Sequence, residues 1–322
     1  MIILTGAAGF IGSCVLTRLN EAGEEDLILV DHMDDNPLKQ KNLAGKKYRQ
    51  YYDKAEFLSK IVNHELRGQI QCLIHMGACS STLIPDPDYY RQNNFEYTRH
   101  LAQWTLDNDC RFIYASSAAT YGDGQLGYSD ADEVTRQLVP LNHYGRSKHD
   151  FDLWVLNQGL SDRFVGLKFF NVYGPNEYHK GDMRSVILKA YPRVQRDGKI
   201  SLFKSYQKEY SDGEQKRDFI YIRDAVDVVV HFWQNPQLGG IFNVGTGKAQ
   251  SWNQVAQALF KACGREPDIE YIDMPKPLRS QYQYYTQADI SKLRHSGYPC
   301  SFTPLNDAVQ DYVGYLKDER HY

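Results

Sequence analysis

Short apolar runs without polar alternation recur through the first half of the chain, and most end at small or acidic residues. The runs are residues 2–5, 27–31, 71–78, 111–118 and 163–174. A strand that is covered on both faces has this pattern because neither set of its side chains meets water. Residues 10–19 and 94–107, between these runs, carry apolar positions at helical spacing. Strands that alternate with helices predict an α/β fold with a doubly wound parallel sheet.

Beyond residue 171 the pattern changes and predicts a smaller second unit. Residues 181–199 predict a helix and a turn, 205–218 a long polar surface loop, 219–233 a strand and a helix, and 240–247 a strand. We expect the chain to return once to the first unit. The predicted first domain is therefore 1–170 with a returning segment at about 216–246, and the second is 171–215 with 247–322.

The ends of the apolar runs are the first place to look for function. In a doubly wound sheet, ligands bind in the crevice beyond the carboxyl ends of the strands. These ends are predicted at residues 6–12, 31, 77–81, 116–120 and 171–174.

Composition narrows the class of protein. The chain has 322 residues, 42% of them hydrophobic and 24% charged, which is typical of a globular protein in water. A formal net charge of −3 gives no strong field toward nucleic acid or an anionic membrane, and no apolar run approaches the roughly 18 residues of a membrane span. The first residues lack the pattern of a signal peptide. We therefore expect a cytoplasmic protein without a nucleic-acid or membrane partner.

Six cysteines are spread too widely for a metal knuckle or a disulfide framework. They are Cys14, Cys72, Cys79, Cys110, Cys263 and Cys300. We expect reduced, mostly buried thiols, as in the cytosol, and no bound metal.

The sequence TGAAGFIG, residues 5–12, places Gly6, Gly9 and Gly12 between a predicted strand and a predicted helix. Gly6 allows a tight turn, Gly9 lets the backbone approach a pyrophosphate, and Gly12 lets the helix pack closely. Free N–H groups and a partial positive charge at the helix N-terminus favour an anion. A glycine-rich turn alone is weak evidence, but here the strand, the helix and an acidic residue at the end of the next strand agree. The pattern indicates a Rossmann-type dinucleotide-binding unit.

The choice between NAD and NADP stays open from spacing. Asp31 lies 19 residues after Gly12, where a carboxylate usually binds the ribose 2′-hydroxyl of NAD. Lys39 and Lys54 follow, and they could neutralise the 2′-phosphate of NADP or simply be solvated.

Tyr144 and Lys148 stand four residues apart in YGRSK, which puts them on one face of a helix predicted to begin near Pro140. A phenol has a pKa near 10 and is a poor base, but this pKa falls when an ammonium and an oxidised nicotinamide lie close by. Ser117, at the end of the preceding strand, can hydrogen-bond the same substrate oxygen. Such a pair occurs on many helices, yet after the glycine loop and YASSAATYG it indicates dehydrogenase chemistry.

This order of glycine loop, serine strand, Tyr-x-x-x-Lys pair and NVYGP turn resembles the extended short-chain dehydrogenase/reductases that act on nucleotide sugars. Several stretches are further similar to the branch of that family that epimerises ADP-glycero-manno-heptose at C6. They are IHMGACSS, YASSAATYG, NVYGPNEYHKG, KRDFIY, GIFNVGTG and YTQAD. The likeness covers essentially the whole chain.

The resemblance implies a tightly held NADP, with NAD less expected, an ADP-heptose substrate and a homo-oligomer, a pentamer. It implies nucleotide-sugar biosynthesis for the lipopolysaccharide core. Oxidation of C6 to a ketone and return of the hydride to its other face would invert that centre. In this scheme Tyr144 is the acid/base for one epimer and Lys180 for the other, while Lys148 and Ser117 complete the catalytic set.

The resemblance also implies binding residues. With the three glycines, the implied cofactor contacts are Phe10, Ile11, Asp31, His32, Lys39, Lys54, Met76, Gly77, Ala78, Cys79, Ser80, Asn93, Lys148, Val172 and Lys180. The implied substrate contacts are Ser117, Asn171, Asp182, Lys189, Phe203, Lys204, Ser205, Tyr206, Arg217 and Tyr282. Asp182 stands where the family has a small hydroxyl residue, and Lys189 where it has a histidine.

Three other functions compete with this interpretation. A 4,6-dehydratase of the same family carries an acidic pair after the serine, whereas Ala118 and Ala119 follow Ser117 here. Another nucleotide-sugar epimerase or reductase would work with the tyrosine alone, so Lys180 is the discriminating residue. A non-catalytic NADP-binding protein, the candidate from a different class, has no need of an intact Ser117, Tyr144 and Lys148.

Overall fold

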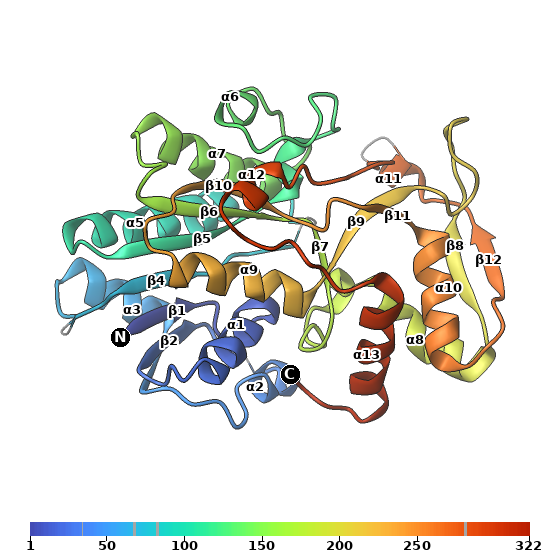
Figure 1. Cartoon of the computed structure of the whole chain (residues 1–322), viewed down its shortest axis with the longest axis horizontal. Helices are drawn as coiled ribbons and strands as arrows, with labels where there is room; N and C mark the ends of the chain where they lie inside the picture. Colours follow the sequence, from blue (N-terminus) through green and yellow to red (C-terminus); the bar gives the residue numbers. More distant parts are fainter. Residues whose placement is uncertain (34, 67–68, 82–83, 280–281) are drawn as a thin grey trace.

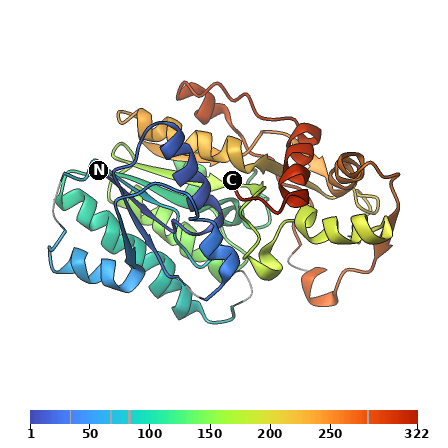
Figure 2. The same cartoon turned by 90° about the horizontal axis from the view of Figure 1, so that it is seen from below.

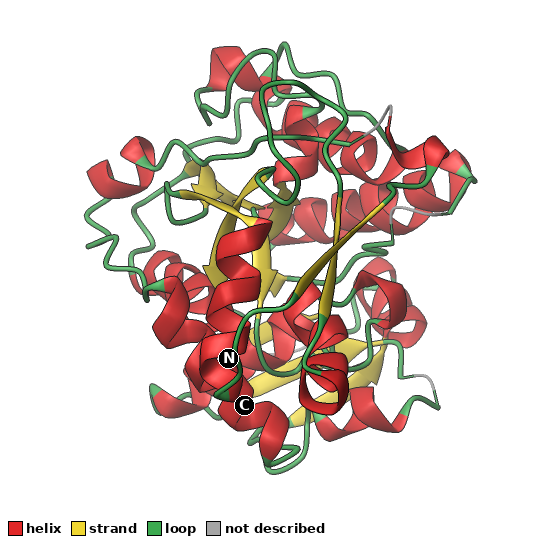
Figure 3. Ribbon diagram, turned by 90° about the vertical axis from the view of Figure 1, so that its right-hand side faces the viewer, coloured by secondary structure: helices red, strands yellow, loops and turns green. Residues whose placement is uncertain are grey.

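The core of the fold is one parallel sheet of seven strands (Figures 1 and 3). A computed structural model describes all residues except 34, 67–68, 82–83 and 280–281. The strands follow the order β10-β6-β5-β4-β1-β2-β3. Their bounds are β1 Ile2–Thr5, β2 Leu27–Asp31, β3 Gln50–Asp53, β4 Cys72–His75, β5 Arg111–Ser117, β6 Phe164–Phe169 and β10 Gly240–Val244.

Alternate residues of the interior strand β1 belong to two separate hydrophobic clusters. Ile2 and Leu4 belong to the cluster beneath one face of the sheet, and Ile3 belongs to the cluster beneath the other. Helices α1 (Phe10–Glu21) and α9 (Ile222–Gln234) cover the first face. Helices α3 (Lys54–Val62), α5 (Tyr97–Asp107) and α7 (His143–Asn157) cover the second. Helices on both faces confirm the predicted doubly wound α/β sheet.

A smaller group of elements lies beside the carboxyl ends of the strands, on the right of Figure 1. It contains helices α8 (Val186–Asp197), α10 (Trp252–Cys263) and α13 (Leu305–Lys317), and the parallel pair β8 (Ile200–Phe203) and β12 (Ile269–Ile272). A three-stranded sheet of β11 (Ala249–Ser251), β9 (Lys216–Tyr221) and β7 (Asn171–Tyr173) adjoins it. The remaining short helices are α2 Pro37–Lys41, α4 Pro87–Tyr90, α6 Asp132–Thr135, α11 Lys276–Arg279 and α12 Ser291–His295.

The apolar run 163–174 is two strands in two sheets rather than one strand. β6 ends at Phe169 and pairs with β5 and β10, whereas β7 begins at Asn171 and pairs with β9. The break at Phe170 carries the chain from the large sheet toward the smaller group of elements, and it therefore opens the crevice beyond the strand ends.

The polar stretch 205–218 is not a surface loop throughout, because β9 begins at Lys216. Asp218 is fully buried, which its charge alone would forbid. Its carboxylate accepts hydrogen bonds from the amides of Thr246 (2.8 Å), Gly247 (2.9 Å) and Ala288 (3.0 Å). These donors replace the water that the carboxylate loses.

Two helix starts also differ from the predictions. Residues Arg91–Glu96 form a π-helical turn, and α5 begins only at Tyr97. Helix α7 begins at His143, three residues beyond Pro140, where the Asn142 side chain accepts a hydrogen bond from the Gly145 amide at 2.8 Å. A side-chain cap, rather than the proline, sets this boundary.

All six cysteines are free, and Cys14, Cys72 and Cys110 are buried while the other three are half-buried. Within the described ranges, no helix has both the length and the apolar composition needed to cross a bilayer.

Candidate active site

A cavity of about 700 Å³ lies at the carboxyl ends of the central strands, between the large sheet and the smaller group of elements. A second cavity of about 600 Å³ adjoins it. The two share Gly6, Asp31, Lys39, Gly77 and Ala78 as lining residues. This is the position predicted for a ligand at the switch point of a doubly wound sheet, where strand order reverses between β1 and β4.

The glycine loop between β1 and α1 forms one wall of the larger cavity. Gly6 has a φ of +67°, and a Cβ there would stand 2.5 Å from the amide nitrogen of Gly77. A Cβ on Gly12 would meet the Gly6 carbonyl oxygen at 2.0 Å. Gly9 caps helix α1 without a side-chain hydrogen bond, so the first N–H groups of the helix stay open toward the cavity. Open N–H groups on a glycine turn fit the pyrophosphate of a dinucleotide.

Asp31 at the end of β2 is paired with a lysine. Its Oδ1 lies 3.0 Å from the Lys39 ammonium and accepts from the His32 amide at 2.7 Å, while its Oδ2 accepts from the Ala8 amide at 2.8 Å. Lys39 also donates to the His32 carbonyl oxygen. The carboxylate and the ammonium predicted to choose between NAD and NADP therefore lie in direct contact with each other.

Lys54 lines the second cavity with His32, Cys79 and Asn93. Its ammonium donates to the Asn93 Oδ1 at 2.6 Å and lies 4.9 Å from the centre of the Tyr97 ring. Burial lowers the pKa of Lys54. The structure thus brings a second cation to the side of the crevice that holds Asp31.

The loop after β4 reaches both cavities. Met76, Gly77, Ala78 and Ser80 line the larger one, and Cys79 lines the second. The buried side chain of Asn94 holds this loop, because it accepts from the Cys79 amide at 2.8 Å and donates to the Cys79 carbonyl at 3.0 Å. Asn94 lies in the π-helical turn Arg91–Glu96.

Tyr144 and Lys148 of α7 and Ser117 at the end of β5 line the larger cavity together. The Lys148 ammonium donates to the Ala115 carbonyl oxygen at 2.8 Å, and burial lowers its pKa to about 8. Burial raises the pKa of Tyr144, and a hydrogen bond with Ser117 opposes that rise. Ser117 Oγ accepts from the Ala119 amide at 3.1 Å and so caps the 3-10 turn Ala118–Tyr121.

Lys180 enters the same cavity from the loop that follows β7. Its ammonium lies 4.8 Å from the centre of the Phe10 ring, at the start of α1. Burial lowers the pKa of Lys180, and Glu177 partly opposes this. In the described part of the chain no carboxylate forms an ion pair with this ammonium. A partly desolvated ammonium beside the dinucleotide loop is able to donate a proton or to accept one when neutral.

Glu177 anchors the Lys180 loop from within. This fully buried carboxylate accepts from the Ser185 amide at 2.5 Å and the Gly174 amide at 3.3 Å. It also accepts from the hydroxyl of Tyr312, on helix α13, at 3.0 Å.

Asn42 fastens the same loop to the glycine loop. Its buried amide donates to the carbonyl oxygens of Ala8 (3.0 Å) and Asn176 (3.2 Å). Its Oδ1 lies 2.7 Å from Nδ1 of His321. The end of the chain therefore packs beside α1 and α2, as Figure 2 shows.

His179 lines the cavity next to Lys180, and burial lowers its pKa to about 4. The imidazole is therefore neutral at physiological pH.

The predicted substrate residues divide into two groups. Asn171, Lys189 and Arg217 line the larger cavity, as does Ser117. The other predicted positions are outside its lining, namely Asp182, Phe203, Lys204, Ser205, Tyr206 and Tyr282. Tyr282 stacks on Arg217 at 5.0 Å, and Lys189 donates to the Asp182 carbonyl oxygen at 2.6 Å, so these two residues support groups that do line the cavity.

Cations dominate the part of the cavity away from the glycine loop. Arg217 is buried, its pKa is lowered by burial, and no carboxylate in the described chain pairs with it. Arg184 also lines the cavity, and its buried Nε has no hydrogen-bond partner among the described residues. With Lys189, which lines the same cavity, they favour an anionic substrate.

Over residues 2–245 the sequence matches the NAD dependent epimerase/dehydratase family. The chain belongs to this family.

Relatives of this epimerase/dehydratase resemble it over its full length. The ADP-L-glycero-D-manno-heptose-6-epimerase of Nitratidesulfovibrio vulgaris is 50% identical over 313 residues, which cover 97% of each chain. The protein of that name from Fusobacterium nucleatum is 42% identical over 332 residues, covering 100% of both chains. Among solved structures, the Helicobacter pylori ADP-L-glycero-D-manno-heptose-6-epimerase superposes with a TM-score of 0.81 at 29% identity, covering 98% of this chain and 96% of that one.

Sequence reasoning missed several residues that line the cavity of this epimerase/dehydratase. They are Asn36, Met183, Arg184, Trp252, Gln283 and Thr286. Arg184 was within reach, since it stands four residues after Lys180 in the same loop. Thr286 lies within the family-like stretch YTQAD and Gln283 follows the predicted contact Tyr282, but no local pattern in the sequence shows that these residues or Trp252 face the cavity.

Proposed function

We propose that the chain is an NADP-dependent ADP-glycero-manno-heptose 6-epimerase. The observation that carries the proposal is that two acid/base groups, Tyr144 and Lys180, reach one cavity from different elements. The strong full-length similarity to proteins named as heptose 6-epimerases supports the choice of substrate. Inversion of a secondary alcohol through a ketone calls for a proton acceptor on one side and a proton donor on the other.

A bound nicotinamide would supply reversible hydride transfer, by which C6 of the sugar would be oxidised to a ketone and then reduced on its opposite face. Tyr144 takes the hydroxyl proton of one epimer, and Ser117 donates a hydrogen bond to the same oxygen. Because burial raises the pKa of Tyr144, the phenolate needs the positive charge of Lys148 nearby. Lys180 serves the oxygen of the other epimer. Its lowered pKa brings the amine closer to the range in which it exchanges protons near neutral pH.

NADP is the proposed cofactor because two cations border the site of its 2′-phosphate. The Lys39 ammonium, which pairs with Asp31 at 3.0 Å, offsets the negative charge that would repel a phosphate there. Lys54 adds a second ammonium to the lining of the cavity that Asp31 and Lys39 also line. A phosphate between two ammonium groups gains charge-assisted hydrogen bonds that a ribose hydroxyl does not.

The substrate half of the cavity disfavours a 4,6-dehydratase. Elimination of water needs a carboxyl acid and base, but among the described residues the cavity lining contains lysines and arginines and, apart from Asp31, no carboxylate. Ala118 and Ala119 occupy the positions after Ser117.

The proposal is tested with the purified protein and ADP-D-glycero-D-manno-heptose. Mass spectrometry of the released cofactor identifies NADP or NAD, and proton NMR of the C6 centre follows the epimers. The expected result is bound NADP and an approach to an equilibrium mixture of epimers from either side. A protein that binds NADP but never interconverts the epimers refutes the proposed activity.

We further propose a cytoplasmic homo-oligomer, a pentamer, that supplies ADP-heptose for the lipopolysaccharide core. Six free thiols are in keeping with a reducing compartment. We also propose two domains. The cofactor domain is residues 1–170 with about 216–246, and the substrate domain is the remainder. The position of β10 in the large sheet supports this division. Light scattering of the purified protein measures the number of subunits.

A further inference from the structure

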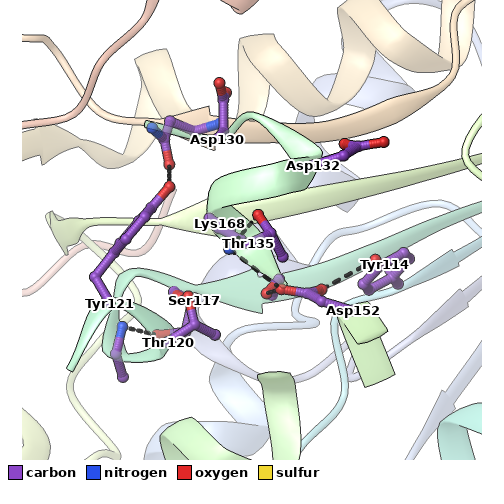
Figure 4. A network of polar contacts seen from close by, with 12 residues as sticks. Tyr114, Ser117, Thr120, Tyr121, Asp130, Asp132, Thr135, Asp152 and Lys168 are labelled. Atoms are coloured by element: carbon purple, nitrogen blue, oxygen red, sulfur yellow. Dashed lines mark hydrogen bonds and ion pairs between the residues drawn. The ribbon is translucent and has the colours of Figure 1, made fainter. Parts of the chain in front are cut away.

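Near Ser117 lies a buried ion pair that the proposed reaction does not use (Figure 4). Asp152 of α7 and Lys168 of β6 are both fully buried, and the Asp152 Oδ2 lies 3.6 Å from the Lys168 ammonium. The Tyr114 hydroxyl donates to the Asp152 Oδ1 at 3.0 Å, and the Ser116 hydroxyl donates to the Oδ2 at 2.8 Å. Both carboxylate oxygens are therefore satisfied by groups of the sheet.

Asp152 and its hydrogen-bond partner Ser116 each stand near a proposed catalytic residue along the chain. Asp152 stands one helical turn beyond Lys148 on α7, and Ser116 immediately precedes Ser117 on β5. Lys168 is the register partner of Ser116 between β5 and β6. The carboxylate consequently ties the helix of one acid/base to the strand that presents the serine.

Lys168 also contacts the turn that follows Ser117. Its ammonium lies 4.7 Å from the centre of the Tyr121 ring and 3.3 Å from the Thr135 hydroxyl. Tyr121 ends the 3-10 turn that Ser117 caps, and Figure 4 shows its ring close to this network. Burying an ion pair costs desolvation energy that often exceeds the attraction, so stability alone is a weak reason for such a pair.

We propose that Asp152 is a positioning residue, which holds the helix of Tyr144 and Lys148 against the strand of Ser117, and that Lys168 is its required counter-ion. The inference rests on the proposed function for the reaction that it serves. Both residues lie outside the cavity lining, so they act through the groups that do line it.

The same carboxylate acts on the charge of Lys148. Burial is the main influence on this ammonium and lowers its pKa to about 8, while Asp152 and, more weakly, Cys79 raise it. His75, on strand β4 next to β5 in the sheet, is buried and neutral, because burial holds its pKa well below the usual value. Loss of the Asp152 charge therefore lowers the pKa of Lys148 further.

Asp152→Asn tests the inference, because the amide keeps the shape and one acceptor oxygen but loses the charge. We expect kcat to fall roughly 10- to 100-fold, as a small misplacement of catalytic groups does, while KM changes less than about twofold. The alkaline limb of the pH profile should move to lower pH. The matched control is Asp150→Asn, since Asp150 is on the same helix and pairs at the surface with Arg146 at 2.8 Å; it should leave the rate and the pH profile unchanged.

Asp152→Asn also leaves Lys168 buried without a counter-ion and so risks misfolding. The double variant Asp152→Asn, Lys168→Met removes both charges and should recover the melting temperature, but neither the rate nor the pH profile. A second readout needs no sugar. This readout is the affinity for NADP, measured by calorimetry from pH 6 to 9. The affinity should fall as Lys148 loses its proton, and this fall should occur at lower pH in the variants than in the wild type.

The outcomes separate this inference from the proposed function. A wild-type protein that does not turn over ADP-heptose refutes the function, and the pH dependence of NADP affinity then still decides the role of Asp152. An active wild type with wild-type kcat and an unmoved pH profile in a folded Asp152→Asn variant overturns the inference alone. Wild-type kcat in the double variant would reduce the pair to a purely structural role.

Discussion

Replacing Lys180 with methionine should abolish epimerisation without disturbing the fold. Methionine matches the length of lysine and keeps contact with Phe10. The variant loses the interaction of the ammonium with the ring at 4.8 Å, of about 0.5–2 kcal/mol, and regains about 0.3–1.5 kcal/mol from sulfur on the ring. Stability should therefore change by less than about 2 kcal/mol. The lost acid/base group should lower kcat by about 10²- to 10⁴-fold.

The assay for this variant is proton NMR of the C6 centre, started separately from each epimer of ADP-glycero-manno-heptose. A melting curve and the NADP content establish that the protein is folded and loaded. Lys199→Met is the matched control, because its ammonium lies at the surface, 3.6 Å from Asp268, and its loss should leave the rate unchanged. A Lys180→Met protein that epimerises within threefold of the wild-type rate would refute the two-base reasoning.

Three further outcomes follow from other parts of the site. The Lys148 ammonium is present below its pKa of about 8 and is lost as pH rises through it, so kcat/KM of the free enzyme should fall above about pH 8; a profile that stays flat to pH 10 contradicts this. Lys39→Ala should raise the Kd for NADP roughly 10- to 100-fold, the equivalent of one charged hydrogen bond of about 1.5–3 kcal/mol, and the Kd for NAD much less; calorimetry with both cofactors decides, and equal weakening counts against the 2′-phosphate contact. Glu177→Gln should destabilise the protein by about 1–3 kcal/mol, because a carboxylate that accepts from the Ser185 amide and the Tyr312 hydroxyl loses its charge; an unchanged melting temperature would show that these bonds contribute nothing.

The sequence alone was sufficient to predict the large sheet, the glycine loop and the Tyr144–Lys148 pair. Buried parallel strands are continuous apolar runs, and their order along the chain fixes the layers. The glycine loop and the Tyr144–Lys148 pair are local patterns, since each depends on residues a few positions apart. Lys180 was placed by resemblance rather than by physics, because nothing in the spacing of its loop indicates which strand end it faces.

Groups that depend on distant partners were beyond prediction. Asp218 is an ordinary charged residue in the sequence, and only the amides of Thr246, Gly247 and Ala288 make its burial possible. Asn42 likewise links segments more than 100 residues apart, as its bond to Asn176 shows. Such contacts are formed by tertiary folding, so neither periodicity nor local propensity records them.

The anchoring of the Lys180 loop has a consequence for the order in which the protein is made. The seven strands of the large sheet, the glycine loop and Tyr144 all lie before residue 245, but Tyr312, which holds the loop through Glu177, is translated later. Since chains fold progressively from the N-terminus during synthesis, a nascent chain can complete its cofactor crevice while Lys180 is still unsecured. The ability to bind the cofactor would then arise on the ribosome before the second acid/base group is held in place.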